Sequence, residues 1–234
     1  MTIVPLSEKI AASRELLSGL LCVHGPARVA VAWTGGKDST VALDLWRGVL
    51  AGEEGAARGS GPVHVLSVDT GLKFPEVVAF RDRWAREWGL KLTVARPAVE
   101  LRGYPVAVDK VACCRDLKVV PLQRAIGEMR LSALISGLRR DEHESRADRE
   151  YLEPRPETAD APAYVQCNPL LDWSEMDIWA YLTGRDLPFC ELYAQGYRSL
   201  GCVPCTAQSG RGERSGRSAD KEAKLDVLRS LGYF

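Results

Sequence analysis

Short, continuous apolar runs alternate along the chain with longer stretches in which apolar residues recur at helical spacing. The apolar runs are ARVAVAW (27–33), VHVLSVD (63–69), KLTVARP (91–97) and ALISGL (133–138). The first helical patterns are STVALDLWRGVL (39–50) and FPEVVAFRDRWAREWG (74–89). Strands that are apolar on both faces and alternate with helices are typical of a parallel sheet covered on both sides. We therefore predict an α/β fold with a doubly wound, mostly parallel sheet.

The second half of the chain contains one further clear helix signal. SEMDIWAYLTGRDLP (174–188) predicts a helix with Ser174 as its N-cap and Pro188 just beyond its end. The segments 51–62 and 153–164 are rich in Gly or Pro and are interpreted as surface loops. We expect one nucleotide-binding domain over 1–200, which includes the Cys-Cys pair. Residues 201–234 form its Cys-x-x-Cys and an Arg/Gly-rich tail that is mobile or ordered only by a ligand.

Composition removes several classes of function. The 234 residues contain 31 Lys plus Arg and 31 Asp plus Glu, so no overall charge attracts the chain to nucleic acid or to an anionic membrane. The first residues lack a basic region followed by an apolar region, and no window is apolar for long enough to cross a bilayer. The expectation is a cytoplasmic protein without a membrane partner, in which seven cysteines are not structural disulfides.

The stretch VAWTGGKDSTVALDL (29–43) places two glycines between an apolar run and a helical pattern. Free N–H groups and the dipole at a helix N-terminus favour an anion, and glycines let it approach the backbone. The spacing fits neither the Walker A nor the GxGxxG pattern. Phosphate of a nucleotide is the natural ligand, and the candidate binding residues are Thr34, Gly35, Gly36, Lys37, Asp38 and Ser39.

Four cysteines form two close pairs. Cys113 and Cys114 are adjacent, and Cys202 and Cys205 form a Cys-x-x-Cys motif. Four thiolates suit either a tetrahedral zinc ion or an iron–sulfur cluster, and their spacing leaves both open. Adjacent residues bind a single zinc ion awkwardly, whereas they can reach different irons of one cubane. Adjacency therefore favours a cluster.

An ordered set of motifs carries a family resemblance from about Ala27 to Arg217. The motifs are TGGKDS, DTGLKFPE, CCRDLK, ISGLRRDE, NPLLDWSEMDIWAYL, LPFCELYAQGYRSLGCVPCT and ERSGR. The chain resembles the sulfonucleotide (adenylyl-sulfate and phosphoadenylyl-sulfate) reductases and, less closely, the small subunit of bacterial ATP sulfurylase. Its glycine loop is similar to the SGGxDS loop of the N-type ATP pyrophosphatases. The resemblance implies an adenine nucleotide alpha-hydrolase-like fold and an oxidoreductase of sulfate assimilation that acts on a sulfur group.

The resemblance also assigns residues. Cluster-containing reductases hold a four-iron, four-sulfur (4Fe-4S) cluster through a Cys-Cys pair and a distant Cys-x-x-Cys. The resemblance implies that the metal ligands here are Cys113, Cys114, Cys202 and Cys205. The ATP sulfurylase subunit lacks this set. Lys118 matches the lysine after the pair and would link the cluster to the bound anion. The remaining residues that match positions near the nucleotide are Asp69, Thr70, Arg214 and Arg217.

Two arginines follow the predicted strand ALISGL, whose end faces the ligand side of the sheet. Guanidinium groups match the oxygens of phosphate or sulfate, so we predict Arg139 and Arg140 as an anion clamp rather than a solvated charged run.

The attacking thiol is the point where the sequence departs from the family pattern. Cluster-type reductases end in a Glu-Cys-Gly-Leu-His tail whose cysteine attacks the sulfate sulfur, whereas no cysteine follows Cys205 here. Cys22 and Cys167 are expected to be buried, which leaves Cys190, in the loop after Pro188, as the best substitute. Otherwise a thioredoxin-like or other thiol partner supplies the nucleophile.

Three functions fit these observations. The first is reduction of adenylyl sulfate or phosphoadenylyl sulfate to sulfite. The second is ATP-dependent sulfur transfer or adenylylation in a thiolation pathway, the one case in which nucleic acid would be a substrate. The third is a nucleotide-binding iron–sulfur subunit that needs a catalytic partner. The motif set favours the first, and a homo-oligomer is compatible with all three.

Overall fold

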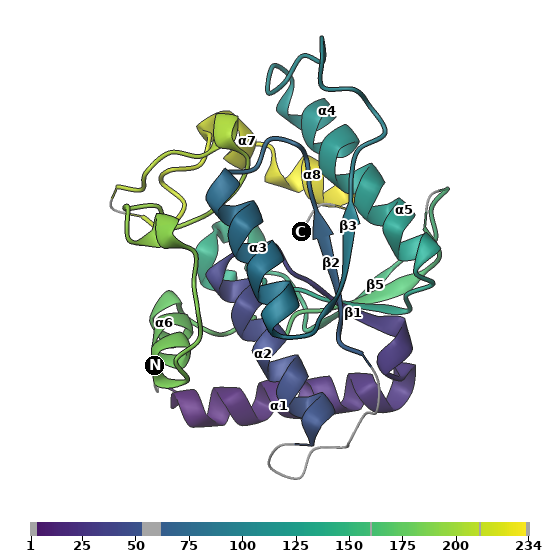
Figure 1. Cartoon of the computed structure of the whole chain (residues 1–234), viewed down its shortest axis with the longest axis vertical. Helices are drawn as coiled ribbons and strands as arrows, with labels where there is room; N and C mark the ends of the chain where they lie inside the picture. The colour runs from purple at the N-terminus through teal and green to yellow at the C-terminus, as the bar shows by residue number, and fades with distance from the viewer. Residues whose placement is uncertain (1–3, 53–61, 160, 211, 233–234) are drawn as a thin grey trace.

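A six-stranded sheet forms the centre of the protein. The computed structural model describes residues 4–52, 62–159, 161–210 and 212–232. The strands lie in the order β3-β2-β1-β4-β6-β5, and every neighbouring pair is parallel except β5 with β6. Their bounds are β1 Val29–Ala32, β2 His64–Val68, β3 Lys91–Ala95, β4 Ala133–Ile135, β5 Leu152–Arg155 and β6 Tyr164–Cys167. The predicted α/β fold with a doubly wound, mostly parallel sheet is confirmed (Figure 1).

Alternate residues of the central strands enter two separate cores. Val29 and Val31 of β1 pack in one core with helices α1, α2, α3 and α6, whereas Ala30 and Ala32 pack in the other with α5. Because successive side chains point to opposite faces, a strand covered on both sides must be apolar throughout. All four residues of β1 are buried, so the apolar run ARVAVAW predicted a strand correctly.

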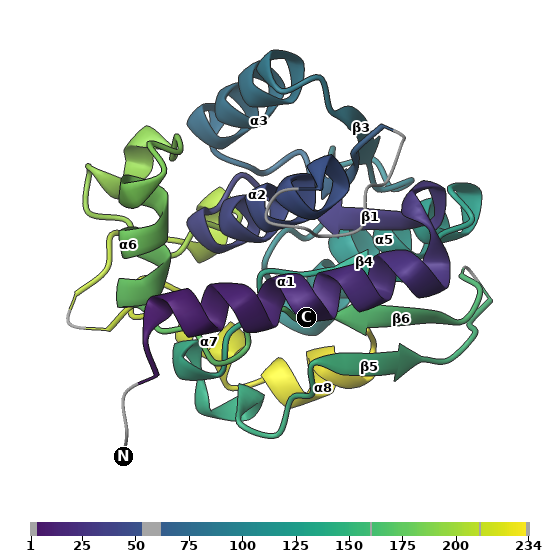
Figure 2. The same ribbon diagram turned by 90° about the horizontal axis from the view of Figure 1, so that it is seen from below.

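Helices α1, α2, α3 and α6 cover one face of the sheet and α5 covers the other; Figure 2 shows α1 alongside α2. The predicted helices are α2, α3 and α6, and in α6 the Ser174 hydroxyl caps the helix by accepting a hydrogen bond from the backbone N–H of Asp177. The helices have the bounds α1 Leu6–His24, α2 Lys37–Ala51, α3 Pro75–Glu87, α4 Lys110–Cys114, α5 Val120–Glu128, α6 Glu175–Gly184, α7 Ala219–Glu222 and α8 Leu225–Ser230.

The proline-rich segment 153–164 is not entirely a loop. Its first residues belong to β5, which pairs antiparallel with β6 at the edge of the sheet. Pro154 is accommodated because an edge strand has one side without strand partners. Of the other predicted loop, 51–62, residues 53–61 lie outside the described residues.

The C-terminal segment, which composition predicts to be mobile or ordered only by a ligand, makes contacts with the rest of the fold. Leu225 and Leu228 of α8 form a small apolar core with Cys114 and Val111 of α4. The backbone of Val203 donates a hydrogen bond to Leu72, which fixes the Cys-x-x-Cys turn on the loop after β2. These contacts join segments far apart in sequence, and composition alone did not indicate them. Within the part of the chain that the structure describes, no helix has the length and apolar character needed to cross a membrane.

Candidate nucleotide and cysteine site

The glycine loop after β1 is a tight turn that leads into α2. Gly35 has φ +79°, a left-handed conformation that glycine adopts without strain, and Gly36 is the N-cap of α2. The hydroxyl groups of Thr34 and Ser39 lie 3.1 Å apart, and the Ser39 hydroxyl donates to the carbonyl of Gly36. The turn thus presents two hydroxyl groups and a helix N-terminus on one side, as an anion site requires.

A cavity lies at this N-terminus, where the chain turns from β1 toward β2 on one side and β4 lies on the other. Open α/β sheets bind ligands at such a switch point, outside the carboxyl ends of the strands. Its wall includes four residues of the loop region, namely Thr34, Gly36, Asp38 and Ser39, and three that follow β4, namely Ser136, Gly137 and Leu138.

Gly137 allows β4 and α2 to approach each other. A Cβ atom at this position would lie 2.6 Å from the backbone nitrogen of Ser39 and 2.7 Å from the carbonyl carbon of Asp38. Backbone cannot move aside as a flexible side chain can, so only glycine fits at this contact.

Five basic side chains contribute to the cavity wall: Lys73, Lys118, Arg146, Arg214 and Arg217. Arg217 lies against Gly201, where a Cβ atom would come 1.9 Å from Nη1. Its Nη1 donates to the Thr206 hydroxyl, whereas its Nε is buried and has no partner among the described residues. A buried donor without a partner is costly, so this guanidinium is suited to an anionic ligand.

Lys37 and Arg139 lie behind this wall and are almost completely buried, with 1% and 0% exposure. Arg139 donates to Asp38 at 2.7 Å, to Asp141, and to both carboxylate oxygens of Glu213 at 2.8 and 2.6 Å. Lys37 pairs with Asp38 and Glu213. Burial opposes ionisation of Asp38, but the charges of Lys37 and Arg139 outweigh it and lower the pKa of Asp38.

Arg140 and Asp69 were also predicted to lie at the nucleotide, but in the structure they contact other groups of the protein. Arg140 pairs with Asp172 and donates to the carbonyl of Arg149, so like Arg139 it faces protein groups, and neither lines the cavity. Asp69 accepts from the backbone N–H of Gly71. The predicted Arg139–Arg140 pair therefore does not line the cavity, and the basic side chains of the wall belong to other residues.

The four paired cysteines lie close enough to one another for their thiols to interact electrostatically, and Cys202 follows Gly201 of the cavity wall. Burial raises the pKa of Cys113, and the nearby thiols of Cys114, Cys202 and Cys205 add to this effect. Burial also opposes ionisation of Cys202, but the charges of Lys118 and Lys73, with a hydrogen bond from Thr70, lower its pKa to about 7.

The segment that follows the Cys-Cys pair has an uncommon geometry. Asp109 caps α4 by accepting from the N–H groups of Val111 and Ala112, and Arg115–Val119 then form a π-helical segment. Such segments are rare and frequently lie at functional sites. This one carries Lys118, which lines the cavity and lies close enough to Cys202 to affect its pKa.

The spacing of the four thiols differs from that of a single-metal site. Tetrahedral zinc with Zn–S bonds of about 2.3 Å brings its sulfur atoms to about 3.8 Å from one another. Among the described residues, which include all four cysteines, no three of these sulfur atoms lie within 4.8 Å of one another.

Comparison with known proteins identifies the family. Residues 28–208 match the phosphoadenosine phosphosulfate reductase domain, which is more than half of the chain. The chain belongs to this family. Its relatives are named as reductases of sulfonucleotides, so the prediction of an oxidoreductase acting on a sulfur group is confirmed.

The relatives carry two substrate names. An adenosine 5'-phosphosulfate reductase of Deinococcus radiodurans is 36% identical over 216 residues, with 89% of this chain and 78% of that protein covered. A phosphoadenosine 5'-phosphosulfate reductase of Alkalilimnicola ehrlichii is 31% identical over 196 residues, with 80% and 74% covered. The structure of a phosphoadenylyl-sulfate reductase from Candida auris in complex with phosphate has the same fold, with a TM-score of 0.65, 21% identity and coverage of 88% and 99%.

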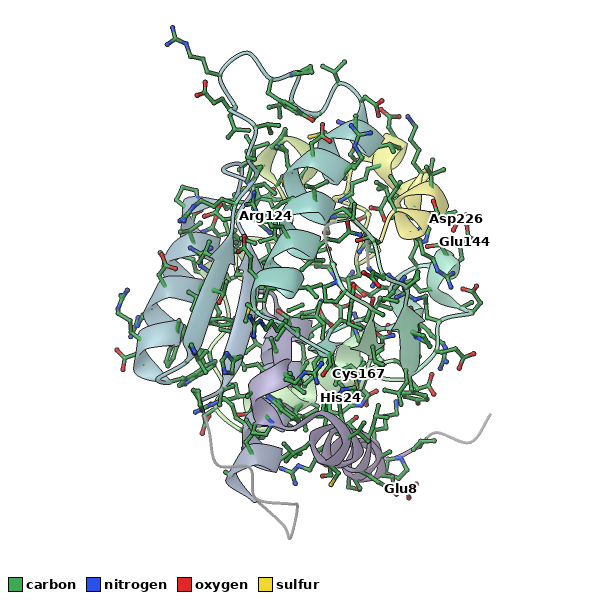
Figure 3. All side chains as sticks on the ribbon, turned by 90° about the vertical axis from the view of Figure 1, so that its right-hand side faces the viewer. Glu8, His24, Arg124, Glu144, Cys167 and Asp226 are labelled. Carbon is green, nitrogen blue, oxygen red and sulfur yellow. The ribbon has the colours of Figure 1, made fainter. Side chains whose placement is uncertain are left out.

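The thiols outside the two pairs do not provide an obvious attacking group for this reductase-family protein. Cys190 is 1% exposed within the main core, burial raises its pKa, and it does not line the cavity. It lacks the exposure and thiolate character that a sulfur carrier needs, which corrects the sequence-based choice. Cys167, labelled in Figure 3, is buried as expected, whereas Cys22 is exposed.

Several residues of the site were not singled out from the sequence. Arg146 and Lys73 line the cavity, Glu213 joins two motifs, and Tyr193 accepts a hydrogen bond from the backbone N–H of Lys37 at 2.8 Å. Glu213 is the first residue of the ERSGR motif, and only the two arginines of this motif were assigned to the nucleotide site from the sequence. A glutamate directly before two arginines of an anion site was the available signal.

Proposed function

We propose that this protein reduces adenylyl sulfate, or its 3'-phosphorylated form, to sulfite and the adenine nucleotide. The observation that carries the proposal is one cavity bounded on one side by the N-terminus of α2 and on another by Arg217, whose buried Nε has no partner among the described residues. Both groups favour the phosphate or sulfate oxygens of such a substrate. Family membership supports the same reaction.

The reaction needs two thiols of a dithiol reductant. A thiolate attacks the sulfate sulfur, an S–S bond forms, and the S–O bond breaks so that AMP or its 3'-phosphate leaves with the electron pair. A second thiolate attacks the carrier sulfur, which forms a disulfide and releases sulfite. Two thiols are thereby oxidised and the sulfur gains two electrons. Because Cys190 and Cys167 are buried, and the exposed Cys22 of α1 does not line the cavity, we assign the attacking thiol to a separate, thioredoxin-like molecule.

The four paired cysteines are suited to a 4Fe-4S cluster. Two of them are adjacent in sequence, and a cubane holds each thiolate on a different iron. Cys113, Cys114, Cys202 and Cys205 would be the ligands. When bound, the cluster would supply a redox-capable group beside Lys118. Lys118, which reaches both Cys202 and the cavity, would hold positive charge between the ligand set and the substrate anion.

Adenylylation from ATP is less well supported. It calls for a divalent cation on the triphosphate, and the carboxylates of Asp38, Glu142 and Glu213 do approach within 4.8 Å of one another. Asp38 and Glu213, however, are paired with Lys37 and Arg139, and Glu142 with Arg146. These cations already balance the carboxylate charges.

The test uses protein purified without oxygen, incubated with adenylyl sulfate or its 3'-phosphate form and a dithiol protein. Sulfite release that depends on the dithiol, persists in Cys190→Ala and falls in Arg217→Ala supports the proposal. Arg217→Lys is the matched control, since it keeps the charge but not the planar guanidinium. Nucleotide binding without sulfite would indicate a subunit that needs a partner, and pyrophosphate release from ATP would indicate adenylylation. Either result contradicts the proposal.

A further inference from the structure

Glu213 connects the C-terminal part of the chain to two buried cations. Its side chain is 9% exposed, and its carboxylate accepts hydrogen bonds from Arg139, which follows β4, and from Lys37, the first residue of α2. Three segments far apart in the sequence therefore meet at one carboxylate.

The ion pairs of Glu213 lie outside the cavity that receives the substrate. Lys37, Arg139 and Glu213 do not line it, whereas Arg214 and Arg217 of the same segment do. Apart from Glu213, Lys37 pairs with Asp38, and Arg139 pairs with Asp38 and with the exposed Asp141. Loss of Glu213 would leave Asp38 as the one buried or half-buried carboxylate paired with these two buried cations, which is unfavourable. Glu213 is thus a fixed part of the fold rather than a group that the substrate displaces.

The segment 212–217 has a second attachment near Arg217. The backbone N–H of Ala207 donates to the carbonyl of Gly216 at 2.7 Å, and a Cβ atom at Gly216 would lie 2.2 Å from the carbonyl oxygen of Ala207. The ion pairs of Glu213 and the backbone contact of Gly216 thus hold the segment at two points. The next residue is Arg217, whose guanidinium lies against Gly201, and both residues line the cavity.

We propose that Glu213 is a positioning residue for substrate binding: its ion pairs with Lys37 and Arg139 fasten segment 212–217 so that Arg217 faces the substrate anion. The proposal rests on the proposed function, because it concerns the same cavity. It also gives Lys37 and Arg139 a structural role behind the cavity, instead of direct contact with the anion.

The first test is a double-mutant cycle measured by calorimetry with adenylyl sulfate. Glu213→Gln should weaken binding by about tenfold or more while the stoichiometry stays near one, since an unfolded fraction would lower stoichiometry and leave the Kd unchanged. In the Arg217→Ala background, Glu213→Gln should change the Kd by less than about threefold, because the two residues act through one contact. Asp220→Asn, which removes an exposed acid from the same part of the chain, is the control and should bind as wild type does.

The second test needs no substrate. Hydrogen exchange should be faster in Glu213→Gln than in wild type or Asp220→Asn at the amides of Ala207, Ser215 and Arg217, whose hydrogen bonds hold the segment. Unchanged exchange, or equal losses of affinity from Glu213→Gln with and without Arg217, would overturn the proposal. Absence of nucleotide binding by wild type would overturn the proposed function itself, and the exchange rates would then decide the role of Glu213 alone.

Discussion

Replacing Gly137 by alanine tests whether the contact between β4 and α2 builds the anion site. The added Cβ would lie 2.6 and 2.9 Å from the backbone nitrogen and Cα of Ser39, so one of the two elements must move. Overpacking costs about 1–3 kcal/mol, and a clash with backbone belongs at the upper end of that range. A loss of about 3 kcal/mol corresponds to a fall in Tm of roughly 6–12 °C for a domain of this size.

The same substitution should weaken nucleotide binding. Displacing the N-terminus of α2 removes at least one charge-assisted hydrogen bond to the anion, worth about 1.5–3 kcal/mol, or about tenfold or more in Kd. Thermal unfolding and calorimetry with adenylyl sulfate measure the two effects. Gly184→Ala is the control, because a Cβ at this last residue of α6 meets nothing within 4 Å; it should leave the Kd unchanged and should not lower the Tm. Wild-type Tm and Kd in Gly137→Ala would refute the reasoning.

Three further predictions concern the loop, the metal and pH. Gly36→Val should weaken nucleotide binding by about tenfold or more in calorimetry, because its side chain would start 3.2 Å from the Thr34 hydroxyl on the cavity wall. Protein prepared without oxygen should contain about four irons per chain, and Cys202→Ser should lose them; stoichiometric zinc in metal analysis would contradict the cluster. Asp38, whose pKa is lowered, should contribute stability that is present above about pH 4 and lost as pH falls through its folded pKa. The Tm of wild type should therefore fall more steeply below about pH 4 than that of Asp38→Asn, and parallel curves would exclude this contribution.

The elements that sequence predicts well here are those whose pattern is local. The runs that became β1 and β4 are apolar because both faces of each strand are covered, and that requirement can be read within a few residues. The cap at Ser174 is equally local. β5 was missed because Pro154 and its polar neighbours are acceptable only at a sheet edge, and the position of a strand in the sheet is a property of the whole fold.

Side-chain direction at the site depends on partners far away in sequence. Arg139 follows β4 at the ligand side of the sheet, as predicted, but its guanidinium binds Glu213, 74 residues later. Composition predicts that the arginine-rich tail is mobile or ordered only by a ligand, whereas in the structure that same carboxylate and the packing of Leu228 near Cys114 connect it to the fold. One long-range ion pair thus accounts for two of the differences between expectation and structure. It directs the Arg139 guanidinium away from the cavity, and the basic side chains of the cavity wall come from other residues, among them Arg217.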